Sequence, residues 1–315
     1  MTLALVLLLG AALISMAAPR MLGPLAATSV PPGVLLAAWL GSIAGALFFG
    51  ASAVVTLAWP DHAPAETAVE AVVRCLSAVS HAMQPWITET LAATGALALL
   101  TITVRAVILG RRYTREQTRL LDYHRDVVSI VAHSRDDGVM WLAHPMPMAY
   151  SVAGRPGFVV ATDGLSQCLS GSERDAVLAH ERAHLRGSHH LIVTTCDILA
   201  AVLPAVPLFA AAPAAVKTLV ELTADQHAAR ATSTATVCSA LTVVSASTLP
   251  QPAGTLGLSN EISLRLLKLR VSWRTRCPKV SYATAAALSM AMPVATALVG
   301  LAATSAAVCL TLAQA

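Results

Sequence analysis

The segment VLAHERAHLRGSHH, residues 177–190, carries histidines and a glutamate at spacings that are typical of metal sites. His180, Glu181 and His184 form the pattern His-Glu-x-x-His. On a helix, residues four apart lie on one face, so the two histidines can bind one metal ion together. Glu181 lies about 100° around the helix, beside the metal, where it can accept a proton from a metal-bound water. The motif therefore predicts hydrolytic chemistry at a metal ion.

The same segment also fits a longer motif, His-Glu-x-x-His-x-x-Gly-x-x-His, in which Gly187 makes a turn and His190 is the third ligand. This is the pattern of metzincin peptidases, which also need a methionine turn beneath the metal. The chain has no methionine between Met148 and Met290, and Met290 falls in the last apolar run. We therefore expect the longer match to be accidental, with His189 and His190 at the helix end, where histidine is favourable beside the helix dipole.

A glutamate on a separate helix, the gluzincin arrangement, is the alternative source of the third ligand. The segment ELTADQHAA offers Glu221. Asp225 is four residues on and shares the face of Glu221, so it can orient a ligating imidazole from behind. His227 lies roughly 120° from that face and is a poor ligand. The predicted site therefore consists of one zinc ion, its ligands His180, His184 and Glu221, the general base Glu181, and Asp225 as a supporting residue.

The rest of the chain is unusually apolar. Of its 315 residues, 56% are hydrophobic and only 12% are charged, against about a quarter in ordinary soluble domains. Three apolar runs come first, at 2–18, 34–58 and 91–109, and a fourth lies at 283–312. Each approaches or exceeds the roughly 20 residues that a membrane-spanning helix needs. The first run has no Lys or Arg before it, unlike a signal peptide, and we expect it to be retained.

The segment between the third and fourth runs is predicted to be a small α+β domain. Ser172, with Asp175 three residues on, is expected to cap the helix that carries the metal motif. Four short β-rich runs precede it, separated by Gly, Pro and Asp, and favour a small sheet. These runs are VVSIVAH (127–133), GVMWLAH (138–144), MAYSVAG (148–154) and GFVVAT (157–162). We predict an α-helical integral membrane protein with a small α+β zinc-peptidase domain of gluzincin type.

The apolar segment 191–213 lies inside this domain and is broken by three prolines. If it crossed the membrane once, Glu221 would end about 30 Å from His180, on the opposite side. It should instead dip into the membrane and return as a hairpin, or pack as buried helices. The predicted organisation is three transmembrane helices in 1–110, a zinc-peptidase domain in 111–280 that includes this hairpin, and a final transmembrane helix in 281–315.

Positive charge sets the predicted orientation of the domain. Arginines follow the third run in RRYTREQTR, 111–119, and a basic stretch at 265–279 precedes the fourth run. Loops rich in Arg and Lys stay in the cytoplasm, so we expect the whole domain to be cytoplasmic. The basic stretch fits equally well a helix on the inner membrane face or a solvated basic helix.

Residues 149–190, followed by ELTADQHAA, resemble the BlaR/MecR family of membrane zinc peptidases, which are antibiotic-sensing transducers. They are similar, more distantly, to HtpX and CAAX-type membrane proteases. The resemblance implies a multi-pass protein of the bacterial inner membrane, with the zinc ligands and general base named above. It also implies a regulatory endopeptidase that cleaves itself or triggers loss of a cytoplasmic repressor. The chain ends three residues after the last apolar run, so we do not expect the family's extracellular penicillin-binding sensor domain or β-lactam sensing.

The run Pro147–Gly154 is predicted to be an edge strand that receives substrate at Ala149, Tyr150 and Ser151. Adding a strand to a sheet edge holds an extended chain beside the metal without sequence-specific pockets. An ordinary core strand is the alternative.

The expected partners are a peptide or protein substrate, such as a cytoplasmic repressor, and the lipid bilayer, with no direct binding of nucleic acid. Two other functions stay open. One is a quality-control protease for damaged membrane proteins, and the other is a non-enzymatic membrane signalling scaffold. The intact Glu181 argues against the scaffold, because a structural zinc site has no need of a general base.

Overall fold

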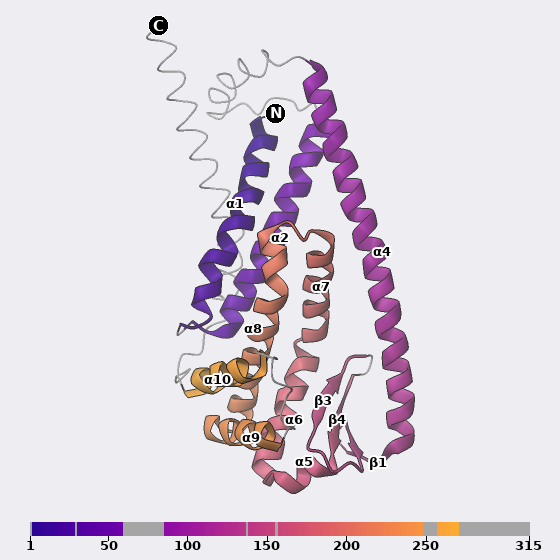
Figure 1. Cartoon of the computed structure of the whole chain (residues 1–315), viewed down its shortest axis with the longest axis vertical. Coiled ribbons are helices and arrows are strands. Elements are labelled where there is room, and N and C mark those ends of the chain that lie inside the picture. The colour runs from indigo at the N-terminus through magenta and orange to yellow at the C-terminus, as the bar shows by residue number, and fades with distance from the viewer. Residues whose placement is uncertain are drawn as a thin grey trace.

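The computed structural model describes residues 2–28, 30–58, 85–136, 138–154, 157–247 and 257–270. They form an elongated helical bundle with a small sheet at one end (Figure 1). The predicted last span at 283–312, and the basic stretch beyond residue 270, lie outside the described residues.

Three helices are long and apolar enough to cross a membrane: α1 (Thr2–Leu25), α2 (Pro32–Ala58) and α4 (Pro85–Val131). They contain the three predicted apolar runs. α1 and α2 pack closely on each other, and α4 contacts α2. α4 is continuous for 47 residues, so the predicted boundary between the transmembrane and peptidase domains at residue 110 falls inside one helix. The three-domain organisation itself stays a prediction.

The end of α4 corrects the first predicted strand. Residues 127–131 continue the helix, and β1 covers only Ala132–Asp136. Val128 is buried against the sheet with Met140 and Val160, while Ile130 is 83% exposed. A short apolar run cannot be assigned to helix or strand by its periodicity alone. Here the run is the face of a helix that covers the sheet.

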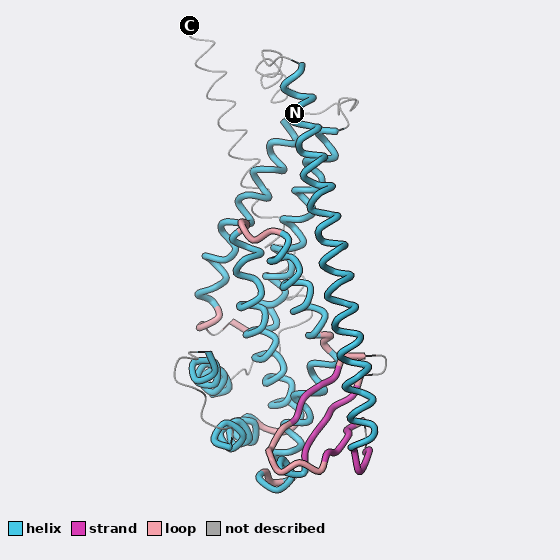
Figure 2. Tube along the Cα trace, turned by 45° about the vertical axis from the view of Figure 1, so that its right-hand side comes forward, coloured by secondary structure: helices cyan, strands magenta, loops and turns pink. Residues whose placement is uncertain are grey.

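The sheet has four strands in the order β1-β2-β4-β3. β2 (Val139–Leu142) pairs parallel with the fully buried β4 (Phe158–Thr162), and β3 (Ala149–Val152) pairs antiparallel with β4. β3 therefore lies at an edge of the described sheet, on the side where it contacts α6. Figure 2 shows the strands gathered at one end of the molecule, beside the end of α4.

Two helices follow β4. α5 (Asp163–Cys168) is short, and α6 (Gly171–Arg186) carries the metal motif. The cap of α6 is Ser170, not Ser172 as predicted. The Ser170 side chain accepts from the Glu173 amide, and the Glu173 carboxylate accepts from the Ser170 amide. This reciprocal pair satisfies two amides at once, which Ser172 and Asp175 do not.

Four more helices follow α6 in the described residues. α7 (His189–Val202) and α8 (Pro207–Ala231) form a helical hairpin at the position of the predicted one, joined by a turn that contains Pro204. α8 packs against α1 and α2, and α7 contacts α4. α9 (Thr234–Ser247) and α10 (Gly257–Arg270) lie across the bundle (Figures 1 and 2). Of these helices, α7, α8 and α9 contact α6. The hairpin returns the chain to α6, so His180 and Glu221 lie at the same end. Its insertion into a membrane stays a prediction.

Candidate metal centre

α6 and α8 bring three candidate ligands together. His180 and His184 are one turn apart on α6, and Glu221 is on the part of α8 that packs against it. Their ligand atoms all lie within 4.8 Å of one another. Within the described part of the chain, this is the group of His, Cys, Asp and Glu side chains that could hold a metal ion.

The distances among these atoms suit a zinc ion. Nε2 of His180 is 3.0 Å from Nε2 of His184. One Glu221 carboxylate oxygen lies 3.4 Å from the first nitrogen, and the other oxygen lies 3.4 Å from the second. Ligands about 2.0–2.2 Å from a tetrahedral zinc lie roughly 3.4 Å from one another. The two histidines need only a small separation to reach that geometry. The three residues therefore fit the metal, although their role as ligands stays a prediction.

Asp225 supports His180 as expected. It is almost fully buried, and its Oδ1 lies 2.9 Å from Nδ1 of His180. An ionised carboxylate can only accept, so Nδ1 carries the proton and donates it. Nε2 is then the ring nitrogen that faces Glu221 and that would be free to bind a metal ion. The hydrogen bond thus selects the tautomer that a metal ligand needs.

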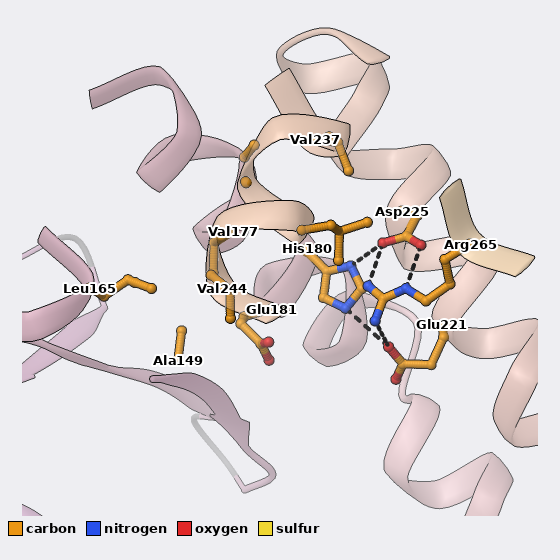
Figure 3. Close-up of a pocket in the computed structure, with 13 residues that line it drawn as sticks. Ala149, Leu165, Val177, His180, Glu181, Glu221, Asp225, Val237, Val244 and Arg265 are labelled. Carbon is orange, nitrogen blue, oxygen red and sulfur yellow. Dashed lines mark hydrogen bonds and ion pairs between the residues drawn. The ribbon is translucent and has the colours of Figure 1, made fainter. Parts of the chain in front are cut away.

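Arg265 on α10 is a site residue that the sequence reasoning missed. Its guanidinium donates to both oxygens of Asp225, at 2.7 and 2.6 Å, and lies 3.4 Å from Glu221. Figure 3 shows it bridging the two carboxylates. We expected it only as part of a basic stretch. A signal was present: two acidic residues four apart on a buried helix face need a cation nearby.

Burial and neighbouring groups act in opposite directions on the pKa values of the cluster. Burial alone would lower the pKa of His180, but hydrogen bonds to Asp225 and Glu221 raise it to about 9. Burial, with the charge on His180, lowers the pKa of His184 to about 3. Burial would raise the pKa of Asp225, yet its hydrogen bonds from Arg265 and His180 hold it below its ordinary value. Burial would also raise the pKa of Glu221, but the hydrogen bond from His180 and its charge hold it below its ordinary value. Both carboxylates are therefore ionised and favour positive charge beside them.

Glu181 lies beside the cluster, on the side of β3. Burial raises the pKa of its carboxyl group, which also makes hydrogen bonds to the side chain and backbone of Ser151. In Figure 3 its carboxylate points between Ala149 and His180. A half-buried carboxylate next to a metal cluster and a strand edge is in the place that a general base requires.

The cluster forms one wall of a cavity whose other walls are apolar. Ala149 contributes from β3, and Val237 and Val244 contribute from α9. The other apolar lining residues are Leu165, Ala176, Val177, Ala240 and Leu241. Ala149, Tyr150 and Ser151, the predicted substrate residues, lie on the edge strand of the described sheet, and Ala149 lines the cavity. Substrate binding there stays a prediction.

His190 does not join the cluster. Its Nε2 lies 3.1 Å from the Ser151 hydroxyl, so it contacts β3 instead. His227 makes a hydrogen bond of 2.8 Å to the Thr223 carbonyl of its own helix. The structure thus brings Glu221, and neither of these histidines, to His180 and His184.

Comparison with known proteins gives two matches. Residues 114–212 match the model of a family described as Peptidase family M48. The chain is also 39% identical over 67 residues to plastoglobule-localized metallopeptidase 48, chloroplastic, of Arabidopsis thaliana. That alignment covers 21% of this chain and 20% of that protein. No solved structure matches the chain significantly. The matched region includes the His-Glu-x-x-His motif and supports a metallopeptidase; it does not single out the BlaR/MecR family.

Proposed function

We propose that this chain is a membrane-embedded zinc metalloendopeptidase, with His180, His184 and Glu221 as ligands of one zinc ion and Glu181 as general base. One observation carries the proposal: the ligand atoms of three side chains from two helices converge within 4.8 Å. The half-buried Glu181 carboxylate beside them favours a catalytic site, because a structural zinc needs no base.

Zinc held at these residues would polarise the scissile carbonyl and lower the pKa of a bound water to about 7. Glu181 is placed to accept a proton from a water molecule at that site and to give it to the leaving amine. The raised pKa of Glu181 suits both roles, because it lies closer to the pKa of the water that gives up the proton. Asp225 holds the ring of His180, and Arg265 holds Asp225.

β3 offers a place for the substrate. The Met148 carbonyl accepts a hydrogen bond from the Thr162 amide. In an antiparallel pair the bonded positions alternate, so Ala149 and Ser151 direct their backbone groups away from β4. In agreement, both the backbone and the side chain of Ser151 make hydrogen bonds to the Glu181 carboxyl group. An extended peptide lying along this edge would pass the general base and the metal cluster, while the apolar cavity accepts one of its side chains.

A substitution at the general base tests the proposal. We expect Glu181→Gln, purified as the full chain in detergent, to keep its zinc and to lose about 10²–10⁴-fold of its peptidase activity. Zinc content by mass spectrometry and cleavage of an unstructured protein substrate are the two readouts. Loss of both together, or unchanged cleavage, would contradict the assigned role of Glu181.

The biological role we propose is regulatory: cleavage of the chain itself or of a cytoplasmic repressor, at the bacterial inner membrane. The support is the three candidate spans and the arginines that follow the third, which favour a cytoplasmic site. Comparing protein N-termini between wild-type cells and a Glu181→Ala strain tests it. New N-termini confined to one or two cytoplasmic proteins favour regulation. Many altered membrane proteins would instead indicate quality control.

A further inference from the structure

The two histidines of the cluster have different supporting partners. His180 donates from Nδ1 to the Asp225 carboxylate. The Nδ1 of His184 lies 3.0 Å from Nδ1 of another histidine, His189. Both His184 and His189 are buried, at 8% and 5% exposure. The sequence offered no role for His189 beyond the favourable place of histidine at a helix end.

The protons of this pair follow from the metal chemistry. A histidine that binds metal through Nε2 is neutral and carries its proton on Nδ1. His184 must then donate from Nδ1. The Nδ1 of His189 lies 3.0 Å away, so it must be the acceptor. His189 therefore keeps its own proton on Nε2. One arrangement of protons satisfies both rings, and it leaves the Nε2 lone pair of His184 directed at Glu221.

The backbone between α6 and α7 places His189 in this position. Ser188 has a φ of 51° and is the one non-glycine residue with positive φ among the described residues. This conformation is costly for residues other than glycine, and such strain is kept where the surrounding structure needs it. The sharp junction turns the first residue of α7 back toward the last turn of α6.

Gly187 leaves the space that the ring of His189 occupies. A Cβ at this position would lie 2.4 Å from Nε2 and 2.6 Å from Cδ2 of His189. The backbone of Gly187 is in the ordinary right-handed region, with φ of −80°, so its conformation alone does not require glycine. The need is for space. A side chain here would push the ring of His189 away from His184.

We propose that His189 is a positioning residue, which accepts the hydrogen bond of His184 and fixes the ring and tautomer that bind zinc, and that Gly187 is glycine to make room for it. The proposal rests on the proposed zinc site. It gives Gly187 a purpose other than the turn of the longer metal motif, and it gives His189 a purpose where that motif gives none. The Nε2 of His190 contacts the Ser151 hydroxyl instead of either ring nitrogen of His184.

The test is the zinc dissociation constant of the full chain in detergent, measured by competition with a chromogenic chelator. Loss of such a supporting hydrogen bond weakens metal binding about 10–100-fold, and we expect this for His189→Ala. His189→Gln should restore affinity to within a few-fold of wild type, because its amide oxygen can accept the same hydrogen bond. His190→Ala, at the neighbouring position, should leave the affinity unchanged.

Gly187→Ala tests the same idea while keeping His189. We expect it to weaken zinc binding as His189→Ala does, and to shift the visible absorption of the Co²⁺-loaded protein. The effect acts through one ring, so the double variant Gly187→Ala/His189→Ala should bind zinc no more weakly than His189→Ala alone. If His189→Ala does not fold, Gly187→Ala and His189→Gln still decide the question.

The outcomes separate the two levels of the proposal. A wild-type chain that binds no zinc would overturn the proposed function and the role of His189 with it. A wild-type chain that binds zinc, whose His189→Ala and Gly187→Ala variants bind it equally tightly, would overturn the role of His189 alone. Failure of glutamine to restore affinity would show that His189 acts by packing and not as a hydrogen-bond acceptor.

Discussion

At the scale of single residues, the candidate metal centre is a series of side chains, each in contact with the next. Arg265 holds Asp225, Asp225 holds His180, and His180 faces Glu221. Each link fixes the orientation of the next. Asp225 and Arg265 are both largely buried, so neither charge is well solvated without the other. The value of the pair lies mainly in what its loss would leave unpaired.

Arg265→Met should therefore destabilise the protein by about 3–5 kcal/mol, the typical cost of removing one partner from a buried ion pair. The measurement is thermal unfolding of the chelator-treated protein, so that lost zinc does not contribute. Arg270→Met makes the same chemical change at an exposed position of α10, and we expect it to have little effect. Equal melting temperatures for the two variants would show that the contact with Asp225 contributes nothing to stability.

At the scale of elements, α6 presents the ligands and its start is fixed by Ser170. Removing a cap costs about 0.5–2 kcal/mol, so Ser170→Ala should lower the melting temperature measurably. Ser172→Ala, two residues on, should not. A larger loss of melting temperature for Ser172→Ala would show that Ser172 caps the helix, as its spacing to Asp175 predicts.

β3 is the second element whose role can be isolated. Ala149 directs its N–H away from β4, so proline there removes a group offered to substrate without breaking the sheet. We expect Ala149→Pro to keep its zinc while kcat/KM falls about 10-fold or more, as for a lost hydrogen bond that leaves its partner unpaired. Tyr150→Pro removes an N–H that pairs with β4 and should reduce zinc content as well. Normal cleavage by Ala149→Pro would reduce β3 to a packing strand.

At the scale of the whole molecule, the site depends on where the chain lies in the membrane. Alkaline phosphatase is active only when exported, so fusions report the side of each loop. The basic residues predict that fusions near Ala71 and after Ala315 are active, and that fusions near Gly138 or Gln251 are inactive. Activity at Gly138 would reverse the orientation and remove cytoplasmic repressors from the possible substrates.

Features that depend on neighbouring residues could be predicted from the sequence, and features that depend on residues far apart in the sequence could not. The helix that carries His180 and His184, the apolar helices and three of the strands follow from local patterns. Residues 127–131 were assigned to a strand because a five-residue apolar run has no decisive period. Arg265 lies 40 residues beyond Asp225, and His189 matters only because Ser188 bends the chain. Contacts of that kind exist only once the helices are packed.

The central claim is that Glu221, and not His190, completes the metal site. The direct test is the metal content of purified variants, measured by mass spectrometry after dialysis against trace zinc. We predict that His190→Ala retains about one zinc per chain, as expected for a site with three protein ligands, and that Glu221→Ala loses most of it. Retention of zinc by Glu221→Ala together with its loss from His190→Ala would contradict the account and make the longer histidine motif the true site.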